Sequence, residues 1–109
     1  MMKKVLILAN NDVGLYKFRK ELVEELLKKY TVSISLPYGS FVDNLCDMGC
    51  KFIDTDIDRR GKNPFSDIKL YKKYRKIIKE VKPDVILTYT IKPNIYGALA
   101  SKGKIKVLS

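Results

Sequence analysis

Short apolar runs alternate with segments of helical periodicity along the whole chain. The run KVLILA at residues 4–9 is almost wholly apolar and stops at polar residues, which is typical of a strand buried on both faces. Residues 15–30 then carry apolar side chains at helical spacing, which predicts an amphipathic helix. These side chains are Leu15, Phe18, Leu22, Leu26 and Leu27. The alternating segment TVSISL at residues 31–36 stops at a Pro-Tyr-Gly turn and predicts a second strand.

The same alternation continues through the rest of the sequence. Ser40 and Ser66 are suited to cap the next two helices, and Gly49 is suited to end the first of them. The predicted elements are, in order, a helix at 41–48, a strand at 51–57, a loop at 58–65, a helix at 66–81, a strand at 84–88, a helix at 93–101 and a strand at 105–108.

This order of elements predicts the α/β class, with a Rossmann-like parallel sheet covered by helices on both faces. A chain of 109 residues has the length of one domain. The last predicted strand has no helix after it to cover its face. We therefore expect residues 1–109 to be a truncated Rossmann-like domain of a longer polypeptide.

Net charge is the feature of the composition that says most about the binding partners of the protein. The net charge is +10, from 22 basic and 12 acidic residues, which favours anionic partners. Nucleic acid is not expected, because no aromatic-interleaved basic strand or recognition-helix motif accompanies the charge. The apolar runs are shorter than a membrane span needs, so neither a membrane span nor a secretion signal is expected. The sequence lacks histidine, so Cys46 and Cys50 are expected to be reduced structural residues and no metal site is expected.

Candidate chemistry is expected where the strands end, because ligands of parallel sheets bind beyond the carboxyl ends of the strands. Gly14 in the loop after the first strand could let a phosphate or sugar approach a helix that Asp12 caps, or it could be a simple turn glycine. The sequence has no G-x-G-x-x-G motif. Thr90 and Lys92 precede a helix that begins at Pro93, where an anion would be favoured. The alternative is that Thr90 only caps that helix and Lys92 is solvated.

The helix expected at residues 66–81 is strongly basic on one face. Its apolar stripe consists of Leu70, Tyr71, Tyr74, Ile77, Ile78 and Val81. The opposite face carries the lysines Lys69, Lys72, Lys73 and Lys76. Two interpretations stay open: a helix with a core-facing stripe and a solvated lysine face, or a helix attracted to an acidic bilayer.

Three motifs carry a resemblance to a known family. They are GLYKFR at residues 14–19, NPF at 63–65 and KPNIYG at 92–97. Together with the strands around them, they resemble the N-terminal domain of family 4 retaining glycosyltransferases with the GT-B fold. Within this family, the sequence most resembles bacterial enzymes of capsular polysaccharide, exopolysaccharide and lipid-linked glycan assembly.

The resemblance implies two Rossmann-like domains, of which the N-terminal one binds mainly the acceptor and the other grips a nucleotide-sugar. It implies transfer with retention, without a cofactor or an obligatory metal. Positions near the donor would be Gly14, Thr90 and Lys92, and acceptor-side positions would be Arg19, Arg59, Arg60 and Asn63. Many family members have a histidine in the segment that corresponds to residues 90–92, and this sequence has none there.

The expected function is therefore that of a cytoplasmic glycosyltransferase fragment at the inner face of the plasma membrane. Its partners would be a nucleotide-sugar, a lipid-linked or glycan acceptor and an anionic membrane surface, and the fragment alone would be inactive. The alternatives are a GT-B sugar-nucleotide epimerase and a flavodoxin-like or receiver-like binding module. A receiver needs paired carboxylates after its first strand, whereas Asn10, Asn11 and Asp12 offer one acid, with Asp54 and Asp56 near the third strand.

Overall fold

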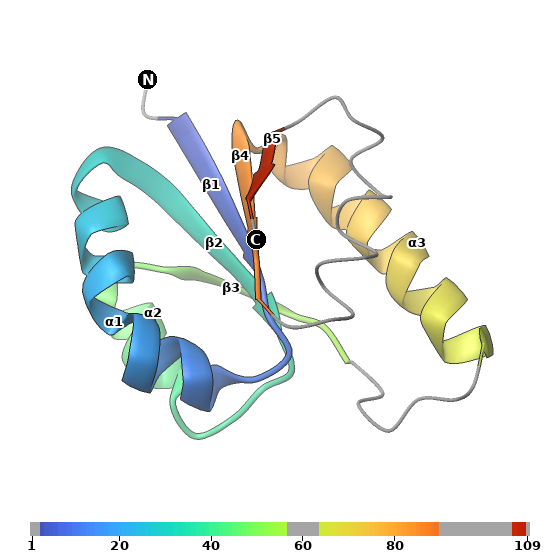
Figure 1. Cartoon of the computed structure of the whole chain (residues 1–109), viewed down its shortest axis with the longest axis horizontal. Coiled ribbons are helices and arrows are strands. Elements are labelled where there is room, and N and C mark those ends of the chain that lie inside the picture. Colours follow the sequence, from blue (N-terminus) through green and yellow to red (C-terminus); the bar gives the residue numbers. More distant parts are fainter. Residues whose placement is uncertain (1–2, 57–63, 90–105, 109) are drawn as a thin grey trace.

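The computed structural model describes residues 3–56, 64–89 and 106–108 (Figure 1). Its five strands form one parallel sheet in the order β3-β2-β1-β4-β5. The strands are β1 (Lys3–Leu8), β2 (Tyr30–Leu36), β3 (Lys51–Asp54), β4 (Val85–Thr88) and β5 (Lys106–Leu108). The helices are α1 (Asp12–Lys29), α2 (Val42–Met48) and α3 (Pro64–Val81). The helix expected at 93–101 lies outside the described residues.

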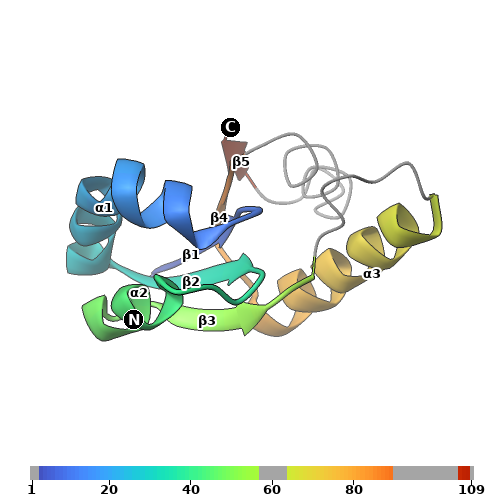
Figure 2. The same cartoon turned by 90° about the horizontal axis from the view of Figure 1, so that it is seen from below.

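The described helices cover both faces of the sheet, as the α/β prediction requires. Figure 2 shows α1 and α2 on one face and α3 on the other. This arrangement follows from right-handed crossovers: β1, β2 and β3 are added in one direction, whereas the connection from β3 to β4 returns past β1 in the opposite direction. The predicted fold class is confirmed, and the sheet order reverses between β1 and β4.

The central strand β1 is buried on both faces, as its continuous apolar sequence predicts. Val5 and Ile7 belong to the core cluster beneath α1 and α2. Leu6 and Leu8 belong to the cluster beneath α3, where they meet Tyr74. Side chains alternate between the two faces of a strand, so β1 supplies both cores.

The two cysteines differ in their surroundings. Cys50 is buried beside α2, whereas Cys46 is exposed, and both are free thiols. Burial raises the pKa of the Cys50 thiol to about 11, so this side chain stays protonated near neutral pH. The structural interpretation therefore holds for Cys50, while Cys46 contributes nothing to the core.

The start of α1 differs from the sequence prediction. The helix begins at Asp12, and its N-cap is Asn11, whose side chain accepts a hydrogen bond from the Gly14 amide at 2.8 Å. Asp12 is therefore not the cap. Phe18 does not join the buried stripe either, because its side chain is 80% exposed. Leu15 is buried as predicted, Leu26 and Leu27 pack against the core, and Val23 is buried where Leu22 was expected.

The predicted serine caps are also wrong. Helix α2 has Phe41 at its N-cap position and no side-chain capping hydrogen bond. Helix α3 begins at Pro64, two residues before Ser66, because proline suits the first turn of a helix. The predicted end of α2 is confirmed, since Gly49 follows the helix with a φ of 121°, a conformation that favours glycine.

Candidate functional site

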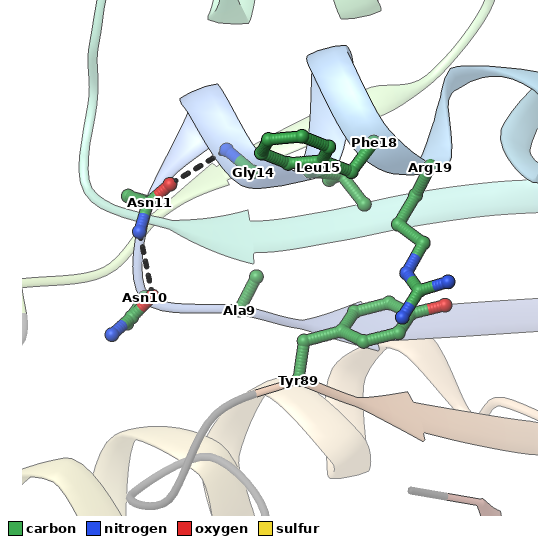
Figure 3. A pocket seen from close by; sticks show the side chains of 8 residues that line it. All are labelled: Ala9, Asn10, Asn11, Gly14, Leu15, Phe18, Arg19 and Tyr89. Atoms are coloured by element: carbon green, nitrogen blue, oxygen red, sulfur yellow. Dashed lines mark hydrogen bonds between the residues drawn. The ribbon is translucent and has the colours of Figure 1, made fainter.

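A pocket lies beyond the carboxyl ends of β1 and β4, where the strand order reverses. In open parallel sheets this is the position at which ligands bind. Its volume is about 350 Å³, within the range of small-molecule sites. The lining residues, drawn in Figure 3, are Ala9, Asn10, Asn11, Gly14, Leu15, Phe18, Arg19 and Tyr89.

The first turn of α1 forms the polar end of this pocket. Asn11 accepts from the Gly14 amide, and its Nδ2 donates to Asn10 Oδ1 at 2.9 Å. Gly14 has no conformational need to be glycine, since it is helical and not at positive φ. A Cβ there would meet a single neighbour within 4 Å, Asn11 Oδ1 at 3.4 Å. A side chain at this position would therefore extend into the pocket and take space from a ligand.

Arg19 supplies the positive charge of the pocket. Its guanidinium carbon lies 5.4 Å from the centre of the Tyr89 ring, a cation–π contact between α1 and the residue after β4. Burial raises the pKa of the Tyr89 phenol, and the nearby Arg19 charge opposes that rise. Among the described residues that line the pocket there is this one cation and no carboxylate. The pocket is thus suited to an anionic group.

Asp12 stands next to the pocket in the sequence but serves another part of the fold. Its side chain is buried, and one carboxylate oxygen accepts from the Phe41 amide at 2.6 Å. The same carboxylate packs against Gly39, so closely that a Cβ at this glycine would overlap it. This contact joins the start of α1 to the segment between β2 and α2, and Asp12 is not among the described residues that line the pocket.

The structure brings together two of the predicted site residues, Gly14 and Arg19. The other rim positions, Arg59, Arg60, Asn63, Thr90 and Lys92, lie outside the described residues. The four lysines predicted to face a membrane are all exposed on α3. These are Lys69, Lys72, Lys73 and Lys76.

Sequence reasoning missed two features of the site. It assigned Phe18 to the core, although this side chain lines the pocket, and it did not pair Tyr89 with Arg19. The signal for Tyr89 was its place directly after a buried strand, which brings a side chain to the rim. No signal in the sequence joins it to a residue of α1.

Comparison with protein families gives one match over almost the whole chain. The model of the family described as glycosyl transferase 4-like matches residues 4–109. A curated relative from Campylobacter jejuni is 29% identical over 96 residues, which are 87% of this chain and 26% of the relative. It is named N,N'-diacetylbacillosaminyl-diphospho-undecaprenol alpha-1,3-N-acetylgalactosaminyltransferase. The chain thus spans about a quarter of that relative's length.

Solved structures show the same fold at low sequence identity. MurG from Acinetobacter baumannii has a TM-score of 0.74 at 21% identity, over 96% of this chain and 33% of that one. A glycosyltransferase from Rickettsia africae has a TM-score of 0.75 at 22% identity, over 97% and 28%. A UDP-N-acetylglucosamine 2-epimerase has a TM-score of 0.70 at 22% identity, over 98% and 31%. Transferases and an epimerase therefore share this architecture.

Proposed function

The chain belongs to the glycosyl transferase 4-like family, and from this premise we propose that it is the acceptor-side domain of a retaining glycosyltransferase. The complete enzyme would contain a second, nucleotide-sugar-binding domain. It would move a sugar from that donor to a lipid-linked or polysaccharide acceptor, as in the bacterial assembly of capsular or other glycans. Its place would be the cytoplasmic face of the plasma membrane.

The observation that carries this proposal is the pocket at the reversal of strand order, with Gly14 and Arg19 in its wall. A cation and a small residue at one rim suit a phosphorylated sugar compound. The name of the Campylobacter jejuni relative includes a diphospho-undecaprenol acceptor, which supports a diphosphate as the group that this chain meets. Arg59, Arg60 and Asn63 on the acceptor side, and Thr90 and Lys92 near the donor, remain proposals on the resemblance alone.

The proposed reaction exchanges one bond at the anomeric carbon of the donor sugar. The bond from this carbon to the diphosphate oxygen breaks, a bond to an acceptor hydroxyl oxygen forms, and the hydroxyl proton leaves with the nucleoside diphosphate or to solvent. Holding both substrates in one cleft is the main contribution of such a two-domain arrangement. The pocket of this chain would bind and orient one of them, and Arg19 would face its phosphate charge.

Transfer assays test the proposal directly. We expect the protein extended beyond Ser109 to transfer sugar from a panel of nucleotide-sugars to undecaprenyl-diphosphate-linked acceptors. The product should keep the anomeric configuration of the donor, as read by NMR coupling constants. The 109-residue chain alone should be inactive. Epimerisation of the nucleotide-sugar without any acceptor would instead support the epimerase alternative. Transfer by the 109 residues alone would contradict the proposal that the reaction needs a second, nucleotide-sugar-binding domain.

Replacing Gly14 with alanine should impair donor use without harming the fold. The added methyl group meets only Asn11 at 3.4 Å, and alanine is favoured over glycine in a helix by about 1 kcal/mol. We therefore expect unchanged or higher thermal stability, together with a rise of about tenfold or more in KM for the nucleotide-sugar. Alanine in place of the exposed neighbour Val13 is the matched control. An unaltered KM in the Gly14 variant would remove Gly14 from the donor site.

The exposed face of α3 supports the proposed contact with a membrane surface. Phe65 and Ile68 are 73% and 50% exposed, and helical spacing places them on the same side as Lys69, Lys72 and Lys76. Apolar side chains among lysines are typical of helices that bind the surface of anionic bilayers. Within the described ranges, none of the helices has the length and apolar character needed to cross a bilayer.

Glutamine in place of both Lys72 and Lys76 should weaken binding to anionic vesicles by about thirtyfold, since each basic residue near the surface contributes about 1 kcal/mol. Co-sedimentation with phosphatidylglycerol vesicles measures this. The matched control replaces Lys17 and Lys20 with glutamine, because both are exposed on α1, across the sheet from α3. Equal losses in the two variants, or binding that salt does not weaken, would contradict a specific role of α3.

A further inference from the structure

The contact between Arg19 and Tyr89 joins two distant parts of the sequence inside the pocket. Arg19 belongs to the second turn of α1, and Tyr89 follows β4 directly. Figure 3 shows the guanidinium over the phenol ring, with both side chains in the pocket wall. The 5.4 Å separation between guanidinium carbon and ring centre is within the range of a cation–π contact.

Arg19 needs such a contact if it is to keep one position. Its side chain is exposed, and an arginine has several rotatable bonds that an unrestrained side chain would explore. Within residues 3–56 and 64–89, no carboxylate forms an ion pair with it. The ring of Tyr89 is thus the described group that restrains the guanidinium. A cation–π contact occupies the side of the guanidinium that faces the ring, so N–H groups that do not face the ring are available for a bidentate contact with phosphate oxygens.

Tyr89 is itself held firmly. Its backbone amide donates to the Leu8 carbonyl at 2.9 Å, which continues the pairing of β4 with β1 beyond the end of the strand. Its half-buried ring packs against the core cluster that contains Ile7 and Leu15. A side chain fixed to the central strands is a rigid support, and rigid supports reduce the entropy that a binding site loses when a ligand arrives.

We propose that Tyr89 is a positioning residue that holds the Arg19 guanidinium in the pocket, so that its N–H edge binds the diphosphate group of a substrate. The inference rests on the proposed function, because it takes the ligand to be a phosphorylated sugar compound. Two substrates of such an enzyme carry a diphosphate, the lipid-linked acceptor and the nucleotide-sugar. The shared chemistry is the diphosphate, and the probes below separate the two sources.

Binding measurements on the purified chain test the positioning role. The probes are farnesyl diphosphate for the lipid-linked source and uridine diphosphate for the nucleotide source, titrated calorimetrically at constant ionic strength. Leucine in place of Tyr89 should weaken binding of the preferred probe about tenfold, because the guanidinium loses its support. Tyr89→Phe should stay within about threefold, since the ring face is retained. Tyr16→Leu is the matched control. The Nζ of Lys20 lies 5.2 Å from the centre of the Tyr16 ring in another cation–π contact, and Tyr16 is not among the residues that line the pocket.

A spectroscopic readout tests the pairing without any ligand. With tyrosine labelled by carbon-13, the phenol of Tyr89 can be titrated by NMR and identified by its absence in Tyr89→Phe. Methionine in place of Arg19 should raise the pKa of this phenol further, because the cation that favours the phenolate is gone. This variant keeps much of the side-chain length, so it serves even if Tyr89→Leu folds poorly.

The outcomes separate the inference from the proposed function. Three results would each overturn the inference. They are wild-type protein that binds neither diphosphate, a Tyr89→Leu variant that binds as tightly as the wild type, and a phenol pKa that Arg19→Met leaves unchanged. If the extended protein transfers no sugar, yet diphosphate binding depends on Tyr89 as described, the positioning role stands and the transferase proposal fails.

Discussion

Replacing Tyr74 with alanine is expected to lower the free energy of unfolding by about 3–5 kcal/mol, the range for removing a large aromatic side chain from a core. Tyr74 is fully buried, and it is the largest of the fully buried side chains among the described residues. It extends from α3 against Leu6, Leu8 and Ile86 of the central strands. The cavity left behind would weaken the whole interface between α3 and the sheet, as chemical denaturation can measure.

Phenylalanine at the same position separates the contribution of ring packing to stability from that of the hydroxyl. The Tyr74 hydroxyl is buried and has no hydrogen-bond partner among the described residues. A buried hydroxyl without a partner costs about 1–3 kcal/mol. Tyr74→Phe should therefore keep the packing and raise the free energy of unfolding by about 1 kcal/mol. A variant less stable than the wild type would show that this hydroxyl contributes a hydrogen bond.

Alkaline pH gives the same comparison a second readout. Burial raises the pKa of the Tyr74 phenol above its ordinary value of 10, so the folded protein holds this proton more tightly than the unfolded chain does. The stability due to Tyr74 is thus fully present below pH 10 and falls as the pH rises further, by about 1.4 kcal/mol per pH unit. Tyr74→Phe should lack this part of the decline. The contributions of Cys50 and Tyr89, whose pKa values are also raised, are common to both proteins and cancel.

The class of fold could be predicted because it depends on patterns that are local in the sequence. The continuous apolar run of β1 predicts burial on both faces, and Val5 and Leu6 do lie in different core clusters. The stripe of α3 was also predicted correctly, since Leu70, Tyr74 and Ile77 are buried. Periodicity shows which faces of an element are apolar. In β1 both faces are apolar and covered, and in α3 the single apolar face is covered by the sheet.

The wrong predictions concern side chains whose positions depend on contacts with segments that are distant in the sequence. Phe18 continues the apolar spacing of α1, yet it lies over the rim of the pocket and not over the sheet. Asp12 is a good capping residue by type, but its carboxylate bonds to Phe41 and leaves the cap to Asn11. For the candidate site, the sequence predicted Gly14 and Arg19 as site residues, and both line the pocket. The contact between Tyr89 and Arg19 could not be predicted, because it depends on the pairing of β1 with β4.

Alanine in place of Asp12 is expected to cost about 3 kcal/mol of stability. The change leaves the Phe41 amide without its charged acceptor, and a charge-assisted hydrogen bond is among the stronger single contacts in a protein. It also removes an acidic residue from the first turn of α1, where negative charge is favourable. Asn in place of Asp12 keeps an oxygen acceptor without the charge, and it should cost about 1 kcal/mol.

Gly39 shows whether this cost arises from the proposed contact. A Cβ at Gly39 would overlap the Asp12 carboxylate, so Gly39→Ala alone should displace that group from the Phe41 amide and cost about 2 kcal/mol. In the Asp12→Ala background there is no carboxylate to displace, and the same substitution should be nearly neutral. The double variant should thus be about 2 kcal/mol more stable than the sum of the single changes allows. Additive losses would mean that the two residues act separately, and that the start of α1 and the segment between β2 and α2 are not joined through Asp12.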